Sequence, residues 1–313
     1  MSNPLKNLEG SVLIVGGSGF IGKALCNQLT KKGQKFVATS RSPGKIPKSL
    51  PQVVLDIFDK KNRVEVLKKF EPKTVVLLAW ETKHQDYWDS KLNIKYMESA
   101  LKFAEESYQF QVSKFIGIGS MSEYGYSPGS CNSARDRVNP QDLYSLTKCH
   151  MSNELLSISR IYKADANWVR LFHPFGFGEK NLRLIPSLIN NMIDKKEVKI
   201  LNPNHKLDFT HVTDIACAIN LIIRGTFPYI TDIGTGNPTS VESIVTLLAN
   251  HLNYPMQKIK YSRSNKLSER NIYVDPNSYL NMTNWRPAKK LDEYLIDYVD
   301  AIVSLKNNSI YNF

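Results

Sequence analysis

Three stretches of the sequence place a lysine four residues after a tyrosine: Tyr87–Lys91, Tyr144–Lys148 and Tyr254–Lys258. On a helix, side chains four residues apart lie on the same face, one turn along. An ammonium there can lower the pKa of the phenol from its ordinary value of about 10. A phenol held in this way can give a proton to a carbonyl oxygen while hydride adds to the carbonyl carbon. The spacing alone is common, so the surrounding sequence must decide which pair is reactive.

The surrounding sequence favours Tyr144 and Lys148. Pro255 lies inside the third pair and predicts a turn there rather than a helix. Ser120, in FIGIGSMSEYG, directly follows the predicted strand of residues 114–119 and is the candidate for a third catalytic group. The first pair lies before this strand, whereas the second pair follows it. Asp142 marks a helix start just before Tyr144. We therefore expect Ser120, Tyr144 and Lys148 to form a catalytic set.

A glycine-rich turn lies near the N-terminus, in VLIVGGSGFIG (residues 12–22). Gly16 allows a tight turn, Gly19 lets the backbone approach a pyrophosphate, and Gly22 lets the following helix pack closely on the strand. The free N–H groups at the start of that helix then face the phosphates. The alternative is a tight turn without a ligand. We expect a dinucleotide site formed by Gly16, Ser18, Gly19, Phe20, Ile21 and Gly22.

The first half of the chain alternates short β-branched runs with longer helical patterns, which predicts a doubly wound α/β fold with a parallel sheet. The predicted strands cover residues 11–15, 35–39, 52–56, 74–79, 114–119 and 167–172. The predicted helices cover about 20–32, 88–108, 142–162 and 185–195. After Phe172 the alternation breaks at HPFGFGEKN. We expect a dinucleotide-binding domain of residues 1–172 and about 203–235, and a smaller, interleaved substrate-binding lobe of residues 173–202 and 236–313.

Composition argues against several classes of protein. The net charge of +12 comes from dispersed lysines, without the basic stripe interleaved with aromatics that is typical of nucleic-acid binding. The four cysteines lack CxxC spacing and the six histidines lack paired-ligand spacing, so we expect reduced thiols and no metal site. There is no apolar run of the roughly 20 residues that a membrane helix needs, and no secretory signal at the start. We expect a cytoplasmic protein that binds neither nucleic acid nor a membrane.

The chain resembles the extended branch of the short-chain dehydrogenase/reductase superfamily, which includes NAD-dependent epimerases and dehydratases. The resemblance is carried by GGSGFIG, by the Ser120–Tyr144–Lys148 set, and by LLAW, VRLFHPFGFGE, LDFTHVTDIA and DIGTGNPTSV. It implies a Rossmann fold that binds a nicotinamide dinucleotide. It also implies that Ser120 hydrogen-bonds the substrate oxygen, that Tyr144 exchanges its proton, and that Lys148 holds the nicotinamide ribose and lowers the tyrosine pKa. Further cofactor contacts are implied at Asp56, Ile57, Leu78, Ala79, Trp80, Asn93, Tyr144 and Phe172.

The second predicted strand ends in Ser40, Arg41 and Ser42. By the resemblance, Ser40 occupies the position where NAD-using relatives carry an aspartate, which binds the adenosine ribose and repels a 2′-phosphate. A serine removes that repulsion, and a guanidinium can bind a phosphate through two hydrogen bonds. The other reading is an ordinary surface arginine after a strand. We therefore expect NADP(H) as the preferred cofactor, with NAD(H) as the alternative.

The loop after Ser120 bears on the reaction. Relatives that dehydrate sugars carry an Asp-Glu pair directly after the catalytic hydroxyl residue, where this chain has Met121 and Ser122. Neither side chain can supply the acid and base for loss of water, so dehydration is disfavoured. Glu123 lies one residue later and would need a different loop path.

Substrate contacts are implied with departures from the family pattern. Leu207 replaces an arginine that often grips the diphosphate, and Arg183, Lys206 or Lys180 could take over that role. His173 stands where relatives usually carry asparagine, and either binds substrate or caps the following turn. The expected substrate contacts are Ser120, Ser122, Glu123, His173 and Arg183.

These features favour an NADPH-dependent reductase of a nucleotide-activated keto-sugar, with a nucleotide-linked 4-keto-6-deoxyhexose as the leading candidate. Cells generally use NADPH for reduction, which supports this direction. A sugar epimerase that retains tightly bound NAD is the nearest alternative. A non-catalytic, regulatory protein that binds NADP(H) is the third, and an intact Ser-Tyr-Lys set argues against it. The resemblance also implies a homodimer, formed through the predicted helices around 90–108 and 142–162.

Overall fold

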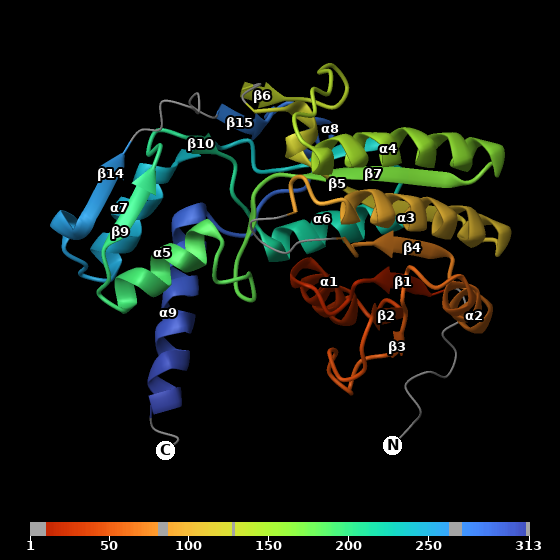
Figure 1. Ribbon diagram of the computed structural model, residues 1–313, viewed down its shortest axis with the longest axis horizontal. Helices are drawn as coiled ribbons and strands as arrows, with labels where there is room; N and C mark the ends of the chain where they lie inside the picture. The colour runs from red at the N-terminus through yellow and green to blue at the C-terminus, as the bar shows by residue number, and fades with distance from the viewer. Residues whose placement is uncertain (1–10, 81–86, 127–128, 263–270, 311–313) are drawn as a thin grey trace. The chain divides into compact units, whose positions relative to one another are not determined.

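Seven parallel strands form one sheet in the part of the chain that the structure describes (Figure 1). This computed structural model describes residues 11–80, 87–126, 129–262 and 271–310. The strands follow the order β12-β7-β5-β4-β1-β2-β3. Their bounds are Val12–Val15 (β1), Phe36–Ser40 (β2), Gln52–Val54 (β3), Thr74–Leu77 (β4), Lys114–Ser120 (β5), Asp165–Leu171 (β7) and Ile230–Ile233 (β12). The strand order reverses between β1 and β4, which is where open α/β sheets bind ligands.

Helices cover both faces of this sheet, and the predicted doubly wound α/β fold is confirmed. The helices are α1 (Phe20–Lys31), α2 (Lys60–Phe70), α3 (Leu92–Gln109), α4 (Leu143–Ile161) and α6 (Val212–Arg224). Strand side chains alternate between the two faces. On one face Leu13, Val37, Val75 and Phe115 join the buried residues of α2, α3 and α4 in one hydrophobic cluster. Helix α1 packs against β1 and β2 and lies outside that cluster, so it covers the other face.

Two glycines on β5 leave room for one large side chain of the neighbouring strand. Trp168 on β7 is fully buried and lies opposite Gly117 in the register. A Cβ at Gly117 would lie 2.6 Å from the Trp168 ring, and a Cβ at Gly119 would clash with its indole nitrogen. The sheet can therefore bury an indole between these two strands only because β5 lacks side chains at both positions.

Of the three spaced Tyr/Lys pairs, all within the described residues, only Tyr144–Lys148 lies on an α-helix. Tyr87 lies in a turn, and Lys91 is the N-cap of α3, so the helix expected from residue 88 begins later. Pro255 precedes the short 3₁₀ helix η2 (Met256–Lys258), which confirms the predicted turn at the third pair.

The chain divides into two units, which we describe separately. The first comprises residues 1–125, 133–171 and 215–233 and contains the seven-stranded sheet; the second comprises 126–132, 172–214 and 234–313. The second unit includes residues 126–132, Phe172 and residues 203–214, which the sequence analysis assigned to the dinucleotide-binding domain.

The second unit contains short strands and several helices. Its sheets have the orders β13-β10-β15-β6, β11-β8 and β14-β9. The strands are β6 (Gly129–Cys131), β8 (Pro174–Phe175), β9 (Val198–Leu201), β10 (Lys206–Leu207), β11 (Thr210–His211), β13 (Thr239–Ser240), β14 (Ile259–Ser262) and β15 (Asn271–Val274). The helices are α5 (Leu184–Ile193), α7 (Val241–His251), α8 (Tyr279–Met282) and α9 (Leu291–Ile310). Helix α7 packs against both α5 and α9.

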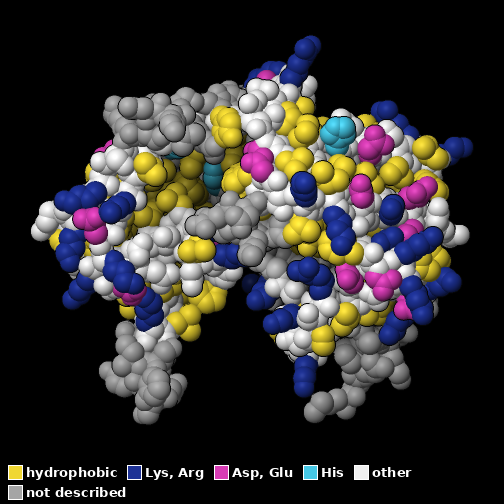
Figure 2. Space-filling view, viewed as in Figure 1, with side chains coloured by type: hydrophobic (Ala, Val, Ile, Leu, Met, Phe, Trp, Pro, Cys, Tyr) yellow, Lys and Arg dark blue, Asp and Glu magenta, His cyan; other side chains and the backbone are white. Residues whose placement is uncertain are grey.

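Charged side chains are mixed on the face that Figure 2 shows, where Lys and Arg are interspersed with Asp and Glu. Within the described residues, every helix is too short or too polar to span a bilayer.

Candidate active site

The glycine turn between β1 and α1 is closed tightly by its own backbone. Gly16 has a φ of +93°, which favours glycine, and a Cβ there would lie 2.9 Å from the backbone nitrogen of Ala79. A Cβ at Gly22 would clash with the carbonyl oxygen of Gly16. The Gly19 N–H donates to that same oxygen over 3.0 Å. Helix α1 can lie this close to the turn only because both positions lack side chains.

The first turn of α1 is open to an anion. Gly19 is the N-cap residue, is exposed, and has no side chain that could cap the helix. Ser18, Phe20 and Ile21 beside it are half-buried. The first N–H groups of a helix lack intrahelical acceptors and lie at the positive end of its dipole, so this end can hold a phosphate. All six residues predicted for the dinucleotide site, Gly16 and residues 18–22, lie in the turn after β1 or in the first turn of α1.

The end of β2 offers fewer free groups than the sequence suggests. Ser40 is buried, and its hydroxyl donates to the Ser42 carbonyl oxygen over 2.8 Å. Arg41 and Ser42 are exposed. Since β2 is the direct neighbour of β1, this strand end lies on the glycine-turn side of the sheet. Arg41 and the Ser42 hydroxyl are therefore the accessible polar groups here, while the Ser40 hydroxyl is engaged with the backbone.

Asp56 and Ile57 follow β3 and point in different directions. The half-buried Asp56 accepts a hydrogen bond from the Phe58 N–H at Oδ1 over 3.0 Å. The Ile57 side chain is buried in the core cluster with α2 and α3. The Ile57 side chain packs in the core, so the expected cofactor contact at this residue falls to its backbone.

Leu78, Ala79 and Trp80 continue from the end of β4 and are all half-buried. The Leu78 N–H donates to the Val15 carbonyl oxygen over 2.8 Å, and the Ala79 backbone lies against Gly16. The structure therefore places this stretch beside the glycine turn.

Asn93 is turned into the protein. It is fully buried, its Oδ1 accepts a hydrogen bond from Trp80 Nε1 over 2.9 Å, and its Nδ2 donates to the Tyr87 carbonyl oxygen over 2.5 Å. The sequence analysis placed Asn93 at the cofactor. The structure instead uses both ends of its amide to hold two aromatic residues of the preceding segment.

Ser120 ends β5 and caps the 3₁₀ helix η1 (Met121–Tyr124). Its hydroxyl oxygen accepts hydrogen bonds from the Ser122 N–H (3.2 Å) and the Ser122 hydroxyl (2.9 Å). Its own N–H donates to Glu123 Oε1 over 2.8 Å, which completes a capping box. Both contacts of the hydroxyl use its oxygen as acceptor, so its proton remains available for a further acceptor.

Glu123 lies beneath Ser120 and does not face a substrate. It is 0% exposed, and its Oε2 accepts from Arg170 Nε over 2.8 Å. Trp168 Nε1 lies 3.1 Å from both of its oxygens. The expected substrate contact of Glu123 is corrected, because the guanidinium, the indole and the Ser120 N–H together satisfy the carboxylate inside the protein.

Helix α4 presents Tyr144 and Lys148 from successive turns. The Asp142 side chain accepts from the Ser145 N–H over 2.7 Å and caps the helix at the residue that the sequence predicts. Tyr144 is half-buried, and the Lys148 Nζ lies 5.7 Å from the centroid of its ring. The Tyr87 ring meets the Tyr144 ring edge-on, with 5.1 Å between centroids. The phenol is therefore held in an aromatic setting close to a cation.

The Lys148 ammonium is buried against β5. Its Nζ donates to the Ile118 carbonyl oxygen over 2.7 Å, on the strand that ends in Ser120. Burial lowers the pKa of Lys148 to about 7, and the Glu123 carboxylate opposes this shift. These contacts bring the pair on α4 to the strand end that carries the serine.

The remaining predicted residues belong to the second unit. Phe172 is fully buried. His173 is half-buried, has a φ of +23°, and lies with its ring 5.4 Å from that of Phe209. Arg183 is the N-cap of α5 and is half-buried. Of the other residues considered for the diphosphate, Leu207 is buried, and Lys180 and Lys206 are exposed.

Trp168 and Arg170 were missed by the sequence analysis. They hold the carboxylate that accepts the Ser120 N–H, so they position the serine from the neighbouring strand. A signal was present: Arg170 lies two residues after Trp168, on the same face of the strand, in a stretch (WVRLF) that is otherwise apolar. A buried guanidinium requires an acidic partner, and the nearby carboxylate after Ser120 was the candidate.

Glu179 gives the second unit a pH-dependent stability. Burial raises the pKa of its carboxyl to about 8, and the Arg183 charge opposes this shift. In the folded protein the Glu179 carboxyl therefore keeps its proton up to about pH 8, whereas in the unfolded chain it loses the proton above about pH 4.5. Because the unfolded chain then binds fewer protons, the free energy of unfolding should fall as the pH rises from about 5 to 8. We expect Glu179→Gln to match the unmodified protein at pH 5 and to be about 2 to 4 kcal/mol more stable at pH 8.5.

Thermal unfolding between pH 5 and 8.5 measures this effect. The exposed Glu242→Gln should leave the pH dependence unchanged. If Glu179→Gln were more stable than the unmodified protein by the same amount at pH 5 and at pH 8.5, the raised pKa of Glu179 would be wrong.

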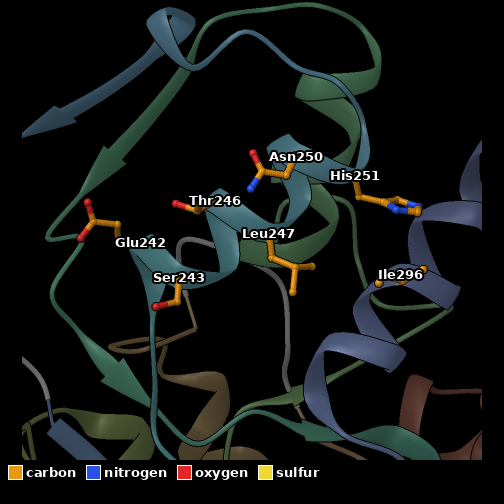
Figure 3. A pocket seen from close by; sticks show the side chains of 7 residues that line it. All are labelled: Glu242, Ser243, Thr246, Leu247, Asn250, His251 and Ile296. Carbon is orange, nitrogen blue, oxygen red and sulfur yellow. The ribbon is translucent and has the colours of Figure 1, made fainter.

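The second unit has a shallow depression between α7 and α9. It has a volume of about 730 Å³, and Figure 3 shows its lining: Glu242, Ser243, Thr246, Leu247, Asn250, His251 and Ile296. No predicted site residue lines it. Among the described residues, no group of three or more His, Cys, Asp or Glu side chains is arranged to hold a metal ion.

Comparison with known proteins decides the family. Residues 12–228, which span the glycine turn, Ser120 and the Tyr144–Lys148 pair, match the family model described as NAD dependent epimerase/dehydratase family. The chain belongs to this family.

Relatives in the epimerase/dehydratase family modify nucleotide sugars. The chain is 23% identical over 251 residues to a dTDP-6-deoxy-L-talose 4-dehydrogenase (NAD(+)) of Aggregatibacter actinomycetemcomitans, covering 77% of this chain and 90% of the relative. It is 22% identical over 316 residues to a dTDP-4-dehydro-6-deoxyglucose reductase of Escherichia coli, covering 94% and 98%. One relative is named for oxidation of a nucleotide sugar and the other for reduction of one.

Solved structures share the fold over most of the chain. A UDP-glucose 4-epimerase of Thermotoga maritima with UDP-glucose matches with a TM-score of 0.85 at 19% identity, covering 95% of this chain and 99% of that one. The protein MoeE5 in complex with UDP-glucose and NAD matches with a TM-score of 0.81 at 25% identity, covering 95% and 100%.

Proposed function

We propose that this protein is an NADPH-dependent reductase of a nucleotide-activated keto-sugar, with a nucleotide-linked 4-keto-6-deoxyhexose as its substrate. The observation that carries the proposal is the placement of Tyr144 one turn before the buried Lys148, against the strand that ends in Ser120. The Escherichia coli relative, named as a reductase of dTDP-4-dehydro-6-deoxyglucose, supports the substrate class and the direction.

The glycine turn fits a nicotinamide dinucleotide, because the exposed Gly19 leaves its backbone open to a pyrophosphate and Gly22 lets helix α1 begin directly against the turn. The N–H groups at the start of α1 would hold its pyrophosphate. Arg41 and the Ser42 hydroxyl would contact a 2′-phosphate. When bound, this cofactor supplies the hydride.

The three catalytic residues then share the work at the carbonyl oxygen. The Ser120 hydroxyl donates a hydrogen bond to this oxygen, for which its proton is available. The Tyr144 phenol gives its proton to the same oxygen as negative charge develops there. The Lys148 ammonium, 5.7 Å from the ring, stabilises the phenolate that remains.

The direct test offers the protein NADPH with a panel of nucleotide-linked keto-sugars and follows cofactor oxidation and the configuration of the product. Oxidation with a 4-keto-6-deoxyhexose is the expected result. Measurable NADPH affinity without oxidation by any member of the panel would reject the reductase and favour a regulatory NADP(H)-binding protein.

Arg41 is expected to set the cofactor preference. Loss of a charge-assisted contact to a 2′-phosphate should raise the KM for NADPH by about 10- to 100-fold in Arg41→Ala, with little change for NADH. Steady-state kinetics with both cofactors measure this. Lys45→Ala, an exposed cation of the same loop, is the matched control and should change neither KM by more than about 3-fold. Equal losses for both cofactors would show that Arg41 does not read the phosphate.

An epimerase with tightly bound NAD is the second candidate. It is favoured by the buried Ser40, whose hydroxyl is engaged with the backbone and so does not itself select a 2′-phosphate. Denaturing the purified protein and identifying the released nucleotide separates the two functions. Oxidised NAD in about one equivalent per chain would select the epimerase, together with turnover in the absence of NADPH.

We also propose a homodimer through α3 and α4, which pack against each other on one face of the sheet. Their exposed apolar residues are Leu92, Ile94, Leu146 and Ile161. Sedimentation equilibrium should give twice the chain mass, and charged substitutions at Ile94 and Leu146 should return the protein to a monomer.

A further inference from the structure

The buried ammonium of Lys148 has an aromatic ring as its second close neighbour. Its Nζ lies 3.5 Å from the centroid of the Trp80 ring and 2.7 Å from the Ile118 carbonyl oxygen. An ammonium has three N–H donors. In the described part of the chain, the Ile118 oxygen is its hydrogen-bond acceptor, and the face of Trp80 takes the place of a second one.

The Trp80 ring is itself held in place. Its Nε1 donates to Asn93 Oδ1 over 2.9 Å, and the fully buried Asn93 is anchored in turn on the Tyr87 carbonyl oxygen. The Trp80 ring also packs against the Tyr96 ring, with 5.8 Å between centroids. The indole therefore cannot turn its face from the ammonium without losing its own hydrogen bond.

The face of an indole carries negative charge density, and it attracts a cation most strongly where both are shielded from water. Burial alone favours the neutral amine at Lys148. Within the described residues, the other groups near the ammonium are the Glu123 carboxylate, the Tyr144 phenol and the Trp168 ring, whose centroid is 5.8 Å away. Trp80 is closer to the ammonium than the Tyr144 and Trp168 rings, so it should contribute more than either to keeping Lys148 charged.

We propose that Trp80, oriented by Asn93, is a positioning residue that holds the Lys148 ammonium charged and aimed beside Tyr144. Its purpose rests on the proposed function, in which Lys148 stabilises the phenolate of Tyr144. The resemblance itself implied only a cofactor contact at Trp80, whereas the structure shows its ring engaged with the lysine.

The test is the titration of Lys148 in the full, cofactor-free chain, followed through its ¹³Cε chemical shift in lysine-labelled protein and assigned with Lys148→Arg. Trp80→Leu keeps the site apolar but removes the ring face, and should lower the Lys148 pKa by about one pH unit. Trp80→Phe keeps a weaker ring face and should have a smaller effect. Trp285→Phe, a buried indole of the second unit, is the matched control and should leave the titration unchanged.

A second measurement makes its main comparison in the unsubstituted sequence. Replacing the tryptophans with 5-fluorotryptophan withdraws charge density from the ring face and should lower the Lys148 pKa in the otherwise unmodified chain. The same replacement in the Trp80→Phe background should have little effect. An unchanged titration in folded Trp80→Leu, or an equal fluorine effect in both backgrounds, would overturn the proposal.

These outcomes are separate from those of the proposed function. The titration uses neither cofactor nor substrate, so an inactive protein can still show the Trp80 effect. Conversely, if the protein reduces keto-sugars and depends on Tyr144 but the Lys148 titration is unchanged in the Trp80 variants, the proposed function stands and the proposed role of Trp80 is wrong.

Discussion

Tyr144→Phe is expected to lose about 10²- to 10⁴-fold in turnover while it still binds NADPH. The substitution removes the proton donor and keeps the ring, which packs edge-on against Tyr87 at 5.1 Å. The loss should therefore fall on kcat, with an unaltered dissociation constant for NADPH. Steady-state kinetics with a nucleotide-linked keto-sugar and a fluorescence titration with NADPH measure the two quantities.

Tyr162→Phe is the matched control, because this tyrosine caps the far end of the same helix. It should keep full turnover. Full turnover in Tyr144→Phe would reject the assignment of the proton donor. A variant that no longer binds NADPH would instead show that the phenol serves the cofactor site.

Glu123→Leu should unfold at a much lower temperature. It would leave the Arg170 guanidinium, which is 3% exposed, without its partner at 2.8 Å, and it would strip the acceptor from Trp168 and from the Ser120 N–H. Removing one partner of a buried ion pair costs about 3 to 5 kcal/mol. For a chain of this size we expect the Tm to fall by roughly 6 to 12 °C.

The matched control is Glu154→Leu on the exposed face of α4, which should change the Tm by less than about 2 °C. Thermal unfolding followed by circular dichroism compares the variants. If Glu123→Leu were no less stable than this control, the ion pair would not be a stabilising feature. Glu123→Gln keeps a hydrogen-bond acceptor, so its Tm should lie between those of Glu123→Leu and Glu154→Leu.

The sheet and its helices could be predicted because their signals are local and repeated. Runs such as VLIV and TVVL are buried on both faces of a parallel sheet, and the helices between them carry apolar residues at helical spacing. The start of α4 was visible in Asp142, whose side chain caps the helix. Such features depend on neighbours in the sequence and so can be read from it.

Side-chain direction after a strand could not be predicted in this way. Ile57 and Glu123 follow strands whose positions were foreseen, yet both side chains point into the protein. For Glu123 the deciding partners are Trp168 and Arg170, more than 40 residues later in the chain. The local pattern shows that Arg170 needs an acidic partner, but it does not specify which of the distant carboxylates that partner is.

The second unit was equally hard to foresee. Strands β8, β10, β11 and β13 each have two residues, too few to show an alternation of apolar and polar positions. Their pairing joins segments far apart in the sequence, as when Leu207 of β10 lies opposite both Thr239 and Ile272. Strands this short depend for their stability on partners that are distant in the sequence.

The packing of Trp168 over Gly117 and Gly119 links the evolution of three positions. No larger residue can enter at either glycine while the indole remains, and a smaller residue at 168 would open a void and release one hydrogen bond of Glu123. Single changes at these sites should therefore be destabilising, whereas compensating changes at both strands should be better tolerated. Lineages that descend from this sequence should keep all three residues together or exchange them in concert.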